Sequence, residues 1–450
     1  ICFSNLFRIS IFGFRIWAML HSQIMPSGLR PRPGPLDPDF YFRYEKEQAM
    51  NDTPQTETTM ALADKYMFQT YARFPVTLVR GEGCRVWDET GKAYLDFVGG
   101  IAVCALGHSS PVVSRALEAQ SKVLVHVSNL YYTLPQIELA RLLVEHSFAD
   151  RVFFCNSGAE ANEAAIKLAR RYANENLGAE RHIIISMEDS FHGRTMATIS
   201  ATGQKKVRTG YDPLLQGFKF VPFNDLESLE KAVDESVCAV MLEPIQGEGG
   251  VVVPGPDYLK GVKAVCRERG ALLIFDEVQV GMGRTGKLFA HEHAGVTPDI
   301  MTLAKALGNG LPVGAMLATE ALNKAFGPGS HATTFGGTPL VTAVAKAVLT
   351  SLLEEGWIDH CRVVGAYFKE KLEALAAKYP FIRSVRGLGL ILGVEMDRPG
   401  APVVKALMEA GFLINCTQET VLRFVPPLVV GRVEIDALVA ALDQALEDIT

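Results

Sequence analysis

Short apolar runs alternate with longer amphipathic stretches between about residue 150 and residue 320. Each apolar run has four to six residues, which is the length of a strand that is buried on both faces. Helix-like segments lie between several runs, including Ala159–Asn176 and Asp257–Arg269, which Gly270 ends. This alternation favours a mostly parallel sheet that helices cover on both faces. The predicted strands are Val152–Cys155, Ile183–Met187, Phe218–Pro222, Cys238–Glu243, Ala271–Asp276, Ile300–Ala304 and Gly314–Ala318.

The C-terminal part of the chain has a different pattern. A long helical pattern runs from Leu340 to about Tyr379, and shorter segments follow it. We predict a smaller α+β domain over residues 340–450, which residues 60–105 join because they are rich in strand and turn signals. Residues 106–339 then form the large domain. The shorter C-terminal segments are strands at Gly389–Glu395 and Leu422–Val425, a helix near Val403–Ala410 and a last helix from Val433.

The first 59 residues are expected to lie outside both domains. Residues 1–20 are apolar and basic, and no acidic residue precedes Asp37. Such a leader is typical of an organellar transit peptide, or of upstream sequence read before a true start at Met50 or Met60. We favour the second interpretation and expect a cytoplasmic protein; a transit peptide would direct it to an organellar matrix.

Composition narrows the class of protein. The chain has 450 residues, a formal net charge of -6 and no basic stripe, so neither nucleic acid nor a membrane surface is an expected partner. Its eight cysteines form no CxxC pair. His291-Glu-His293 lacks the spacing of helical zinc ligands, so no metal site is expected. These features favour an enzyme that acts on small molecules.

One glycine motif invites a nucleotide-binding interpretation that the context does not support. Residues 281–286 read GMGRTG and follow an apolar strand. A dinucleotide fingerprint needs the strand to turn directly into a helix, but residues 276–279 intervene and 287–293 have no helical apolar face. The motif therefore predicts a shaped loop beside another kind of site.

A possible anion site begins where the strand ending at Cys155 meets a helix. Asn156, Ser157, Gly158 and Ala159 form the junction. Free N–H groups and the helix dipole make such a terminus suitable for an anion. An ordinary helix cap by Asn156 or Ser157 is the alternative.

Two further residues end neighbouring strands of the predicted sheet. Asp276 lies at the carboxyl end of one strand, where it can pair with a pyridinium nitrogen or simply cap a neighbour. Lys305 ends the next apolar run before a glycine-rich turn. Desolvation there would lower its pKa and provide the free amine for a Schiff base, whereas a surface lysine is the alternative. The order of anion site, Asp and Lys favours the chemical interpretation.

Together with further segments of the chain, these motifs resemble those of the class III pyridoxal-phosphate aminotransferases. The matching segments occur in the family's order and extend the resemblance from about Tyr66 to the C-terminus. The resemblance implies fold type I, the aspartate aminotransferase-like α/β fold, and pyridoxal 5′-phosphate as the cofactor. The segments are NSGAEANEAAIKLAR, FHGRT, LEPIQGEGG, DEVQVGMGRTG, TLAKALGNGLPVGA and TFGGTPL.

The resemblance also implies a role for individual residues. Lys305 would hold the cofactor as a Schiff base, and Asp276 would pair with the ring nitrogen. Thr334 would reach the phosphate of the neighbouring subunit's cofactor, which implies a homodimer with shared sites. His192 receives no role. The remaining cofactor contacts would be Ser157, Gly158 and Ala159 at the phosphate, Phe191 and Val278 on the ring faces, and Gln279 near the ring hydroxyl.

Substrate recognition is expected to rest on charged residues. Arg194 resembles the residue that binds a substrate carboxylate, and Thr333 is assigned to the substrate as well. Arg386 and Glu248 resemble a pair that closes for the amino donor and opens when 2-oxoglutarate or glutamate binds. The family's transamination of an ω-amino group to 2-oxoglutarate is therefore expected, with N2-acetylornithine as the donor.

Several alternatives stay open at this level. Ornithine, succinylornithine, succinyldiaminopimelate or 4-aminobutyrate would serve as donors on the same fold. An intramolecular aminomutase would turn over without 2-oxoglutarate, and a cofactor-binding regulatory paralogue would not turn over at all. Asn309 and Thr338 stand where the family usually has glycine and asparagine, and Val280 where cysteine is common.

Overall fold

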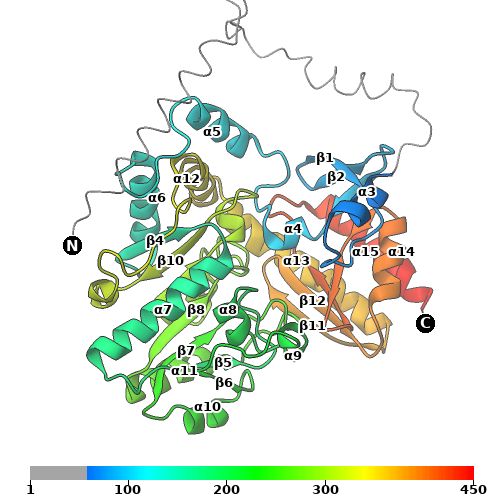
Figure 1. Cartoon of the computed structure of the whole chain (residues 1–450). Helices are drawn as coiled ribbons and strands as arrows, with labels where there is room; N and C mark the ends of the chain where they lie inside the picture. The colour runs from blue at the N-terminus through cyan, green and yellow to red at the C-terminus, as the bar shows by residue number, and fades with distance from the viewer. Residues whose placement is uncertain (1–57, 450) are drawn as a thin grey trace, which may run out of the picture. The chain divides into compact units, whose positions relative to one another are not determined.

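The computed structural model describes residues 58–449 (Figure 1). The chain divides into two compact units, with the boundary after Pro75. The first contains helix α3 (Thr59–Tyr66), whose N-cap Thr58 accepts the Ala61 N–H at 3.2 Å. The predicted leader therefore lies outside the described residues except for its last two positions. Within residues 58–449, no helix is long and apolar enough to cross a bilayer.

A seven-stranded sheet forms the centre of the second unit. Only β10 runs against its neighbours, and the other adjacent strands are parallel. The mostly parallel sheet is thereby confirmed, and its strand bounds differ from the predicted ones by at most one residue. In order across the sheet, the strands are β4 (Arg151–Cys155), β10 (Gly314–Ala318), β9 (Ile300–Leu303), β8 (Leu272–Asp276), β7 (Val237–Leu242), β5 (Ile183–Met187) and β6 (Phe218–Val221).

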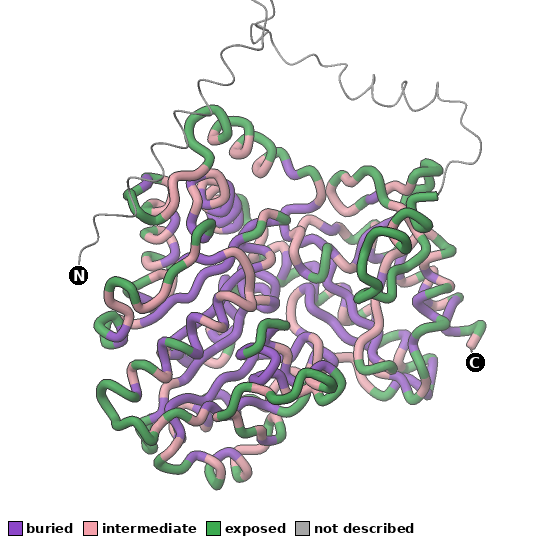
Figure 2. The backbone as a smooth tube through the Cα atoms, in the orientation of Figure 1, coloured by how far each residue is buried: buried purple, intermediate pink, exposed green. Residues whose placement is uncertain are grey.

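Helices cover both faces of this sheet, and Figure 2 shows its inner strands as buried. Successive residues of β8 enter different clusters: Ile274 packs with α7 (Gly158–Asn176), while Phe275 packs with α11 (Tyr258–Arg269). Because both faces are buried, the strands are nearly continuous apolar runs. The other helices of this region are α5 (Pro111–Ser121), α6 (Leu134–Glu145), α8 (Met196–Ala201), α9 (Lys205–Arg208), α10 (Leu226–Ala232) and α12 (Pro339–Glu354), with 3₁₀ turns η1 (Ala290–His293), η2 (Lys305–Leu307) and η3 (Glu320–Ala325).

The long helix predicted over Leu340–Tyr379 is wrong as one element. Helix α12 ends at Glu354, and α13 (Trp357–Lys378) begins after Gly356. Gly356 has φ 78°, a left-handed conformation that only glycine adopts without steric cost. One glycine therefore turns the chain between two helices.

The C-terminal elements surround a four-stranded antiparallel sheet. Its order is β11 (Ile382–Leu388), β12 (Ile391–Met396), β15 (Val421–Phe424) and β14 (Asn415–Thr417). The prediction missed β11, in which only two of seven residues are buried and three have charged or polar side chains. Helices α14 (Ala401–Glu409) and α15 (Arg432–Glu447) pack against each other beside the sheet.

A third sheet joins the N-terminal strands to the C-terminal region. Its order is β1 (Leu78–Glu82), β2 (Arg85–Asp88), β3 (Ala93–Asp96) and β13 (Phe412–Leu413), with β13 parallel to β3. The short turn α4 (Gly99–Ala102) follows β3. This pairing joins the strands within residues 78–96 to the C-terminal region, whereas the grouping of all of residues 60–105 with residues 340–450 stays a prediction.

Candidate active site

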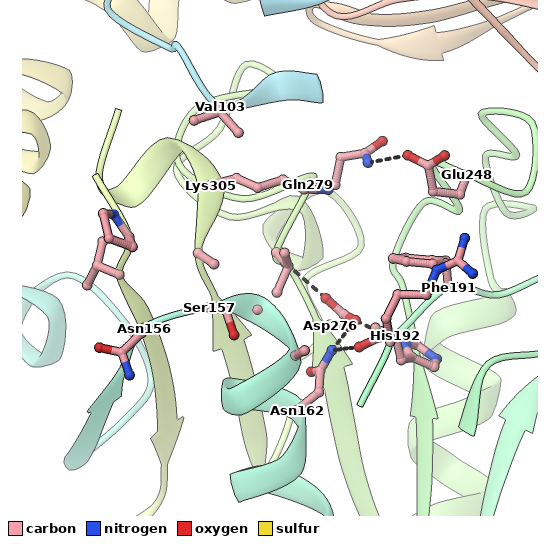
Figure 3. A pocket seen from close by; sticks show the side chains of 18 of the residues that line it. Val103, Asn156, Ser157, Asn162, Phe191, His192, Glu248, Asp276, Gln279 and Lys305 are labelled. Atoms are coloured by element: carbon pink, nitrogen blue, oxygen red, sulfur yellow. Dashed lines mark hydrogen bonds and ion pairs between the residues drawn. The ribbon is translucent and has the colours of Figure 1, made fainter. Parts of the chain in front are cut away.

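A cavity of about 440 Å³ lies at the carboxyl ends of the central strands (Figure 3). The segments that follow β4, β7, β8 and β9 all contribute to its wall. Because parallel strands end at one edge of a sheet, residues far apart in the sequence meet here. The lining includes Ser157, Gly158, Ala159, Asn162, Phe191, His192, Arg194, Glu243, Glu248, Asp276, Val278, Gln279 and Lys305.

Asp276 is the most firmly held group in this cavity. Its Oδ2 accepts a hydrogen bond from Asn162 Nδ2 at 2.7 Å and lies 2.8 Å from His192 Nδ1, as Figure 3 shows. Its Oδ1 accepts the Val278 N–H at 3.0 Å. Asn162 is itself fixed, because it accepts from Thr302 Oγ1 at 2.7 Å and donates to the His192 carbonyl at 2.8 Å. The carboxylate therefore cannot rotate freely.

Lys305 begins η2, one residue after the end of β9, and has φ 46°. A left-handed conformation is costly for a residue with a side chain, and such strain is concentrated at functional sites. Burial lowers the pKa of Lys305, and Arg423 acts in the same direction, while Glu248 opposes both. The lysine is thereby shifted toward the free amine.

The N-terminus of α7 forms the corner expected for an anion. Ser157 caps this 19-residue helix by accepting the Glu160 N–H at 3.1 Å. Gly158 lies so close to Val278 that an added Cβ would be 2.6 Å from Val278 Cγ1. A side chain at position 158 would therefore displace Val278, which lines the cavity, and first-turn N–H groups have no acceptor within the helix.

Phe191, Val278 and Arg194 all line the cavity. The Arg194 guanidinium carbon is 5.6 Å from the Phe191 ring centroid. Arg194 and Glu248 also line an adjoining hollow of about 930 Å³. The exposed Arg194 therefore borders both hollows.

The predicted pair of Arg386 and Glu248 is wrong. Arg386 donates to the Gly250 carbonyl at 2.9 Å and to Ser384 Oγ at 2.9 Å, and it pairs with Glu395. In the β11–β12 register, Ser384 stands opposite Glu395, so the carboxylate of Glu395 lies beside Arg386. Arg386 does not line the cavity.

Glu248 instead forms an ion pair with Arg423 of β15. Arg423 is 1% exposed, and Gln279 Nε2 donates to Glu248 Oε1 at 3.0 Å. Burial would raise the pKa of Glu248, but Arg423 and Lys305 outweigh it and hold that pKa below its ordinary value. The sequence signal was a single arginine within the apolar strand Val421–Phe424, since a buried charge requires a partner.

Thr333 and Thr334 lie outside this cavity, in a neighbouring hollow of about 1230 Å³. Thr333 Oγ1 accepts a hydrogen bond from Asn156 Nδ2 at 3.2 Å, and Asn156 lines both spaces. Thr333 therefore reaches the cavity wall only through Asn156. Thr334 is exposed and cannot contact a ligand within its own subunit's cavity without rearrangement.

The unusual residues near the site have structural partners. Asn309 has φ 45°, accepts the Leu106 N–H at 2.7 Å and donates to the Gly107 carbonyl at 3.2 Å. Thr338 Oγ1 donates to the Val125 carbonyl at 2.7 Å at the start of α12. Asn309 thus bonds to residues 106 and 107, and Thr338 bonds to residue 125. A glycine at position 309 would have no side chain to make these bonds.

Two sequence motifs have structural surroundings of their own. In the loop of residues 281–286, the buried Arg284 donates to the Leu390 carbonyl at 3.0 Å, and no helix follows the loop directly. His291 Nδ1 lies 2.8 Å from Glu277, whereas His293 Nε2 lies 3.0 Å from Thr285 Oγ1. Across the described part of the chain, no group of His, Cys, Asp and Glu is arranged for a metal.

Sequence reasoning also gave no role to Glu243 and Asn162. Both lie within segments that carried the resemblance, and both are buried. A buried carboxylate or amide needs hydrogen-bond partners. The available sequence signal for a role was therefore a polar residue within or directly after an apolar segment. Their partners could not be inferred, because they come from distant parts of the chain.

Comparisons with known proteins agree with this geometry. The family model for class-III aminotransferases matches residues 66–446. The chain is 53% identical over 393 residues to the acetylornithine aminotransferase of Methanocaldococcus jannaschii, covering 87% of this chain and 99% of that protein.

Solved structures of similar proteins have the same fold. An ornithine aminotransferase from Toxoplasma gondii matches with a TM-score of 0.86 and 35% identity, covering 90% of this chain and 98% of that one. An acetylornithine aminotransferase from Elizabethkingia anophelis matches with a TM-score of 0.78 and 33% identity, covering 87% and 100%. The fold, the cavity and these matches together show that the chain belongs to the pyridoxal-phosphate-dependent class-III aminotransferases.

Proposed function

We propose that this aminotransferase moves the ω-amino group of N2-acetylornithine to 2-oxoglutarate, a step of arginine biosynthesis. The observation that carries the proposal is one cavity that brings together Lys305, Asp276 and the N-terminus of α7. Identity above one half to a relative named for acetylornithine supports this donor.

The cavity fits pyridoxal phosphate. Ser157, Gly158 and Ala159 would hold the phosphate with first-turn N–H groups at the start of α7. Phe191 and Val278 would pack on the ring. When bound, the cofactor supplies an aldehyde that condenses with amines and a protonated ring that accepts an electron pair.

Asp276 would hold a proton at the ring nitrogen. Its Oδ1 and Oδ2 are fixed by Val278, Asn162 and His192, so the charge is oriented before any ligand arrives. A preorganised charge acts without the cost of reorientation during the reaction. Gln279, which we assign near the ring hydroxyl, is oriented by its hydrogen bond to Glu248.

Lys305 would carry the proton at the reacting carbon. Its lowered pKa favours the free amine, which can accept a proton and return it to an adjacent atom. Lys305 is the first residue of η2 and lies, like Asp276, at the carboxyl edge of the central sheet, which supports this role.

Arg194 would bind the carboxylate of the donor through its planar, bidentate guanidinium. We assign the second carboxylate site to Arg423 in place of Arg386, because Arg423 is the residue that pairs with Glu248. While the donor occupies the cavity, Glu248 would neutralise Arg423; when 2-oxoglutarate binds, the carboxylate beside its reacting carbon would replace Glu248 as the partner, and its distal carboxylate would bind Arg194. Unpaired, a buried arginine would be strongly destabilising, which supports a need for one partner or the other.

A homodimer with shared sites is part of this proposal. Thr334 lies in a hollow that Leu130, Tyr132 and Phe335 also line, and Tyr132 is 96% exposed. Exposed apolar patches of this kind are typical of interfaces. In a second copy, Thr334 would extend toward the partner's cofactor phosphate. We also retain the cytoplasm as the proposed location.

Ornithine is the alternative donor that a specific observation favours, namely the match to the Toxoplasma gondii structure. Specificity constants for N2-acetylornithine, ornithine, the succinylated donors and 4-aminobutyrate distinguish these proposals. We expect the acetylated donor to lead by at least about tenfold. A preference for free ornithine or 4-aminobutyrate would reject our donor, and turnover without 2-oxoglutarate would indicate an aminomutase.

A further inference from the structure

Glu243 is a buried acidic residue of the cavity to which the proposed reaction gives no role. It directly follows β7 at the carboxyl edge of the sheet, is 4% exposed and lines the cavity. A buried carboxyl is costly unless it accepts hydrogen bonds or meets a charge. Its partners therefore indicate what it does.

The two oxygens of Glu243 hold two different loops. Oε2 accepts the Phe191 N–H at 3.1 Å, and Oε1 accepts the Gly247 N–H at 3.1 Å. Phe191 lines the wall on one side, and Gly247 precedes Glu248, which forms the ion pair with Arg423. One carboxylate thus joins the loop beside the cofactor ring to the loop beside the substrate.

The charged groups that face Glu243 come from three neighbouring segments. They are His192 from the Phe191 loop, Asp276 at the end of β8 and Lys305 after β9. Burial raises the pKa of Glu243 to about 7, with His192 lowering it and Asp276 raising it. The carboxyl therefore changes its protonation state near neutral pH.

Protonation changes what this group can hold. The carboxylate accepts at both oxygens, whereas a protonated carboxyl directs an O–H toward one of the two N–H donors. A buried N–H without an acceptor is unfavourable, so that loop would shift away.

We propose that Glu243 is a positioning residue whose ionised carboxylate holds the Phe191 and Gly247 loops in the shape that binds the cofactor ring. This inference rests on the proposed function. It predicts that ring affinity rises as the pH increases through the range in which Glu243 loses its proton.

The test measures binding of pyridoxamine 5′-phosphate to the cofactor-free full-length protein by titration calorimetry. This probe has the ring and phosphate but forms no Schiff base with Lys305, so it reports the pocket alone. Wild type and Glu243→Gln are compared from about pH 6 to about pH 8.5. This range brackets the raised pKa of Glu243, which is about 7. The amide keeps the size but accepts only one N–H.

We expect Glu243→Gln to bind about tenfold more weakly at the upper pH, with the ratio to wild type narrowing toward the lower pH. The ratio cancels the titration of the probe's own phosphate. A ratio of one at every pH, or a ratio independent of pH, would overturn the inference. Wild type that fails to bind the probe at all would instead overturn the proposed function.

Glu277→Gln is the matched control. Glu277 is 1% exposed and accepts the Ala290 N–H at 2.6 Å and the His291 N–H at 2.8 Å, but it does not line the cavity. The same chemical change there tests general loosening of the fold. If Glu277→Gln reproduces the pH-dependent loss of affinity, Glu243 has no special positioning role; we expect it to leave the affinity within about twofold of wild type.

Discussion

Replacement of Arg423 by methionine tests which arginine binds the second carboxylate. The sequence predicted Arg386 as the partner of Glu248, whereas the structure pairs Glu248 with Arg423. Arg423 is 1% exposed and pairs with Glu248, whereas the Arg386 side chain is 25% exposed and pairs with Glu395 outside the cavity. Truncating one partner of a buried charge pair costs about 2–5 kcal/mol in binding. Because the Glu248 side chain is 26% exposed, we take about 3 kcal/mol, which corresponds to about 150-fold.

The assay follows the two half-reactions separately. With 2-oxoglutarate as the varied substrate, Arg423→Met should lower kcat/KM by about 150-fold. With N2-acetylornithine varied, the loss should stay within about tenfold, because this donor does not need the second carboxylate site. Arg386→Met should change either constant by less than about threefold, since its partly exposed ion pair lies outside the cavity and contributes only about 0.5 kcal/mol.

A double variant addresses the carboxylate that the first change leaves unpaired. Glu248→Gln combined with Arg423→Met removes the buried charge and keeps the loss of the arginine. Its kcat/KM for 2-oxoglutarate should stay low. The reasoning is refuted if Arg386→Met produces the loss selective for 2-oxoglutarate, or if the double variant recovers wild-type activity.

Three further changes test other parts of the site. Lys305→Ala should abolish turnover and the visible absorbance of bound cofactor while the melting temperature of the cofactor-free protein stays within a few degrees; full activity in this variant would exclude the central lysine. Gly158→Ala places a Cβ 2.6 Å from Val278 Cγ1, so cofactor affinity measured by equilibrium dialysis should fall by about tenfold, and unchanged affinity would contradict the phosphate corner. Asn309→Gly loses hydrogen bonds to Leu106 and Gly107 but relieves φ 45°, so urea denaturation should show a net loss of about 1 kcal/mol, and a gain would show that strain outweighs the bonds.

Much of the central fold was predictable from local pattern. The strands of the large sheet are buried on both faces, so each is an apolar run whose ends are visible in the sequence. Asp276 ends β8 and Lys305 follows the adjacent strand β9 after Ala304, so the apolar runs before them placed both residues at one edge of the predicted sheet. The helix break at Gly356 was less visible, because a single glycine within a periodic pattern does not by itself show that the backbone turns.

The sequence by itself determined the order of strands and helices and placed Asp276 and Lys305 near the ends of apolar runs, because such runs and their ends are local properties; the other proposed cofactor contacts came from the family resemblance. Only the tertiary structure decided which arginine faces Glu248. The two partners are 175 residues apart, and either arginine would satisfy a carboxylate in principle. Strand register resolved this choice: it sets Arg386 beside Glu395, whereas β15 places Arg423 beside Glu248, which lines the cavity. Glu243 follows the same rule, since the loops it joins approach each other only when the sheet has formed.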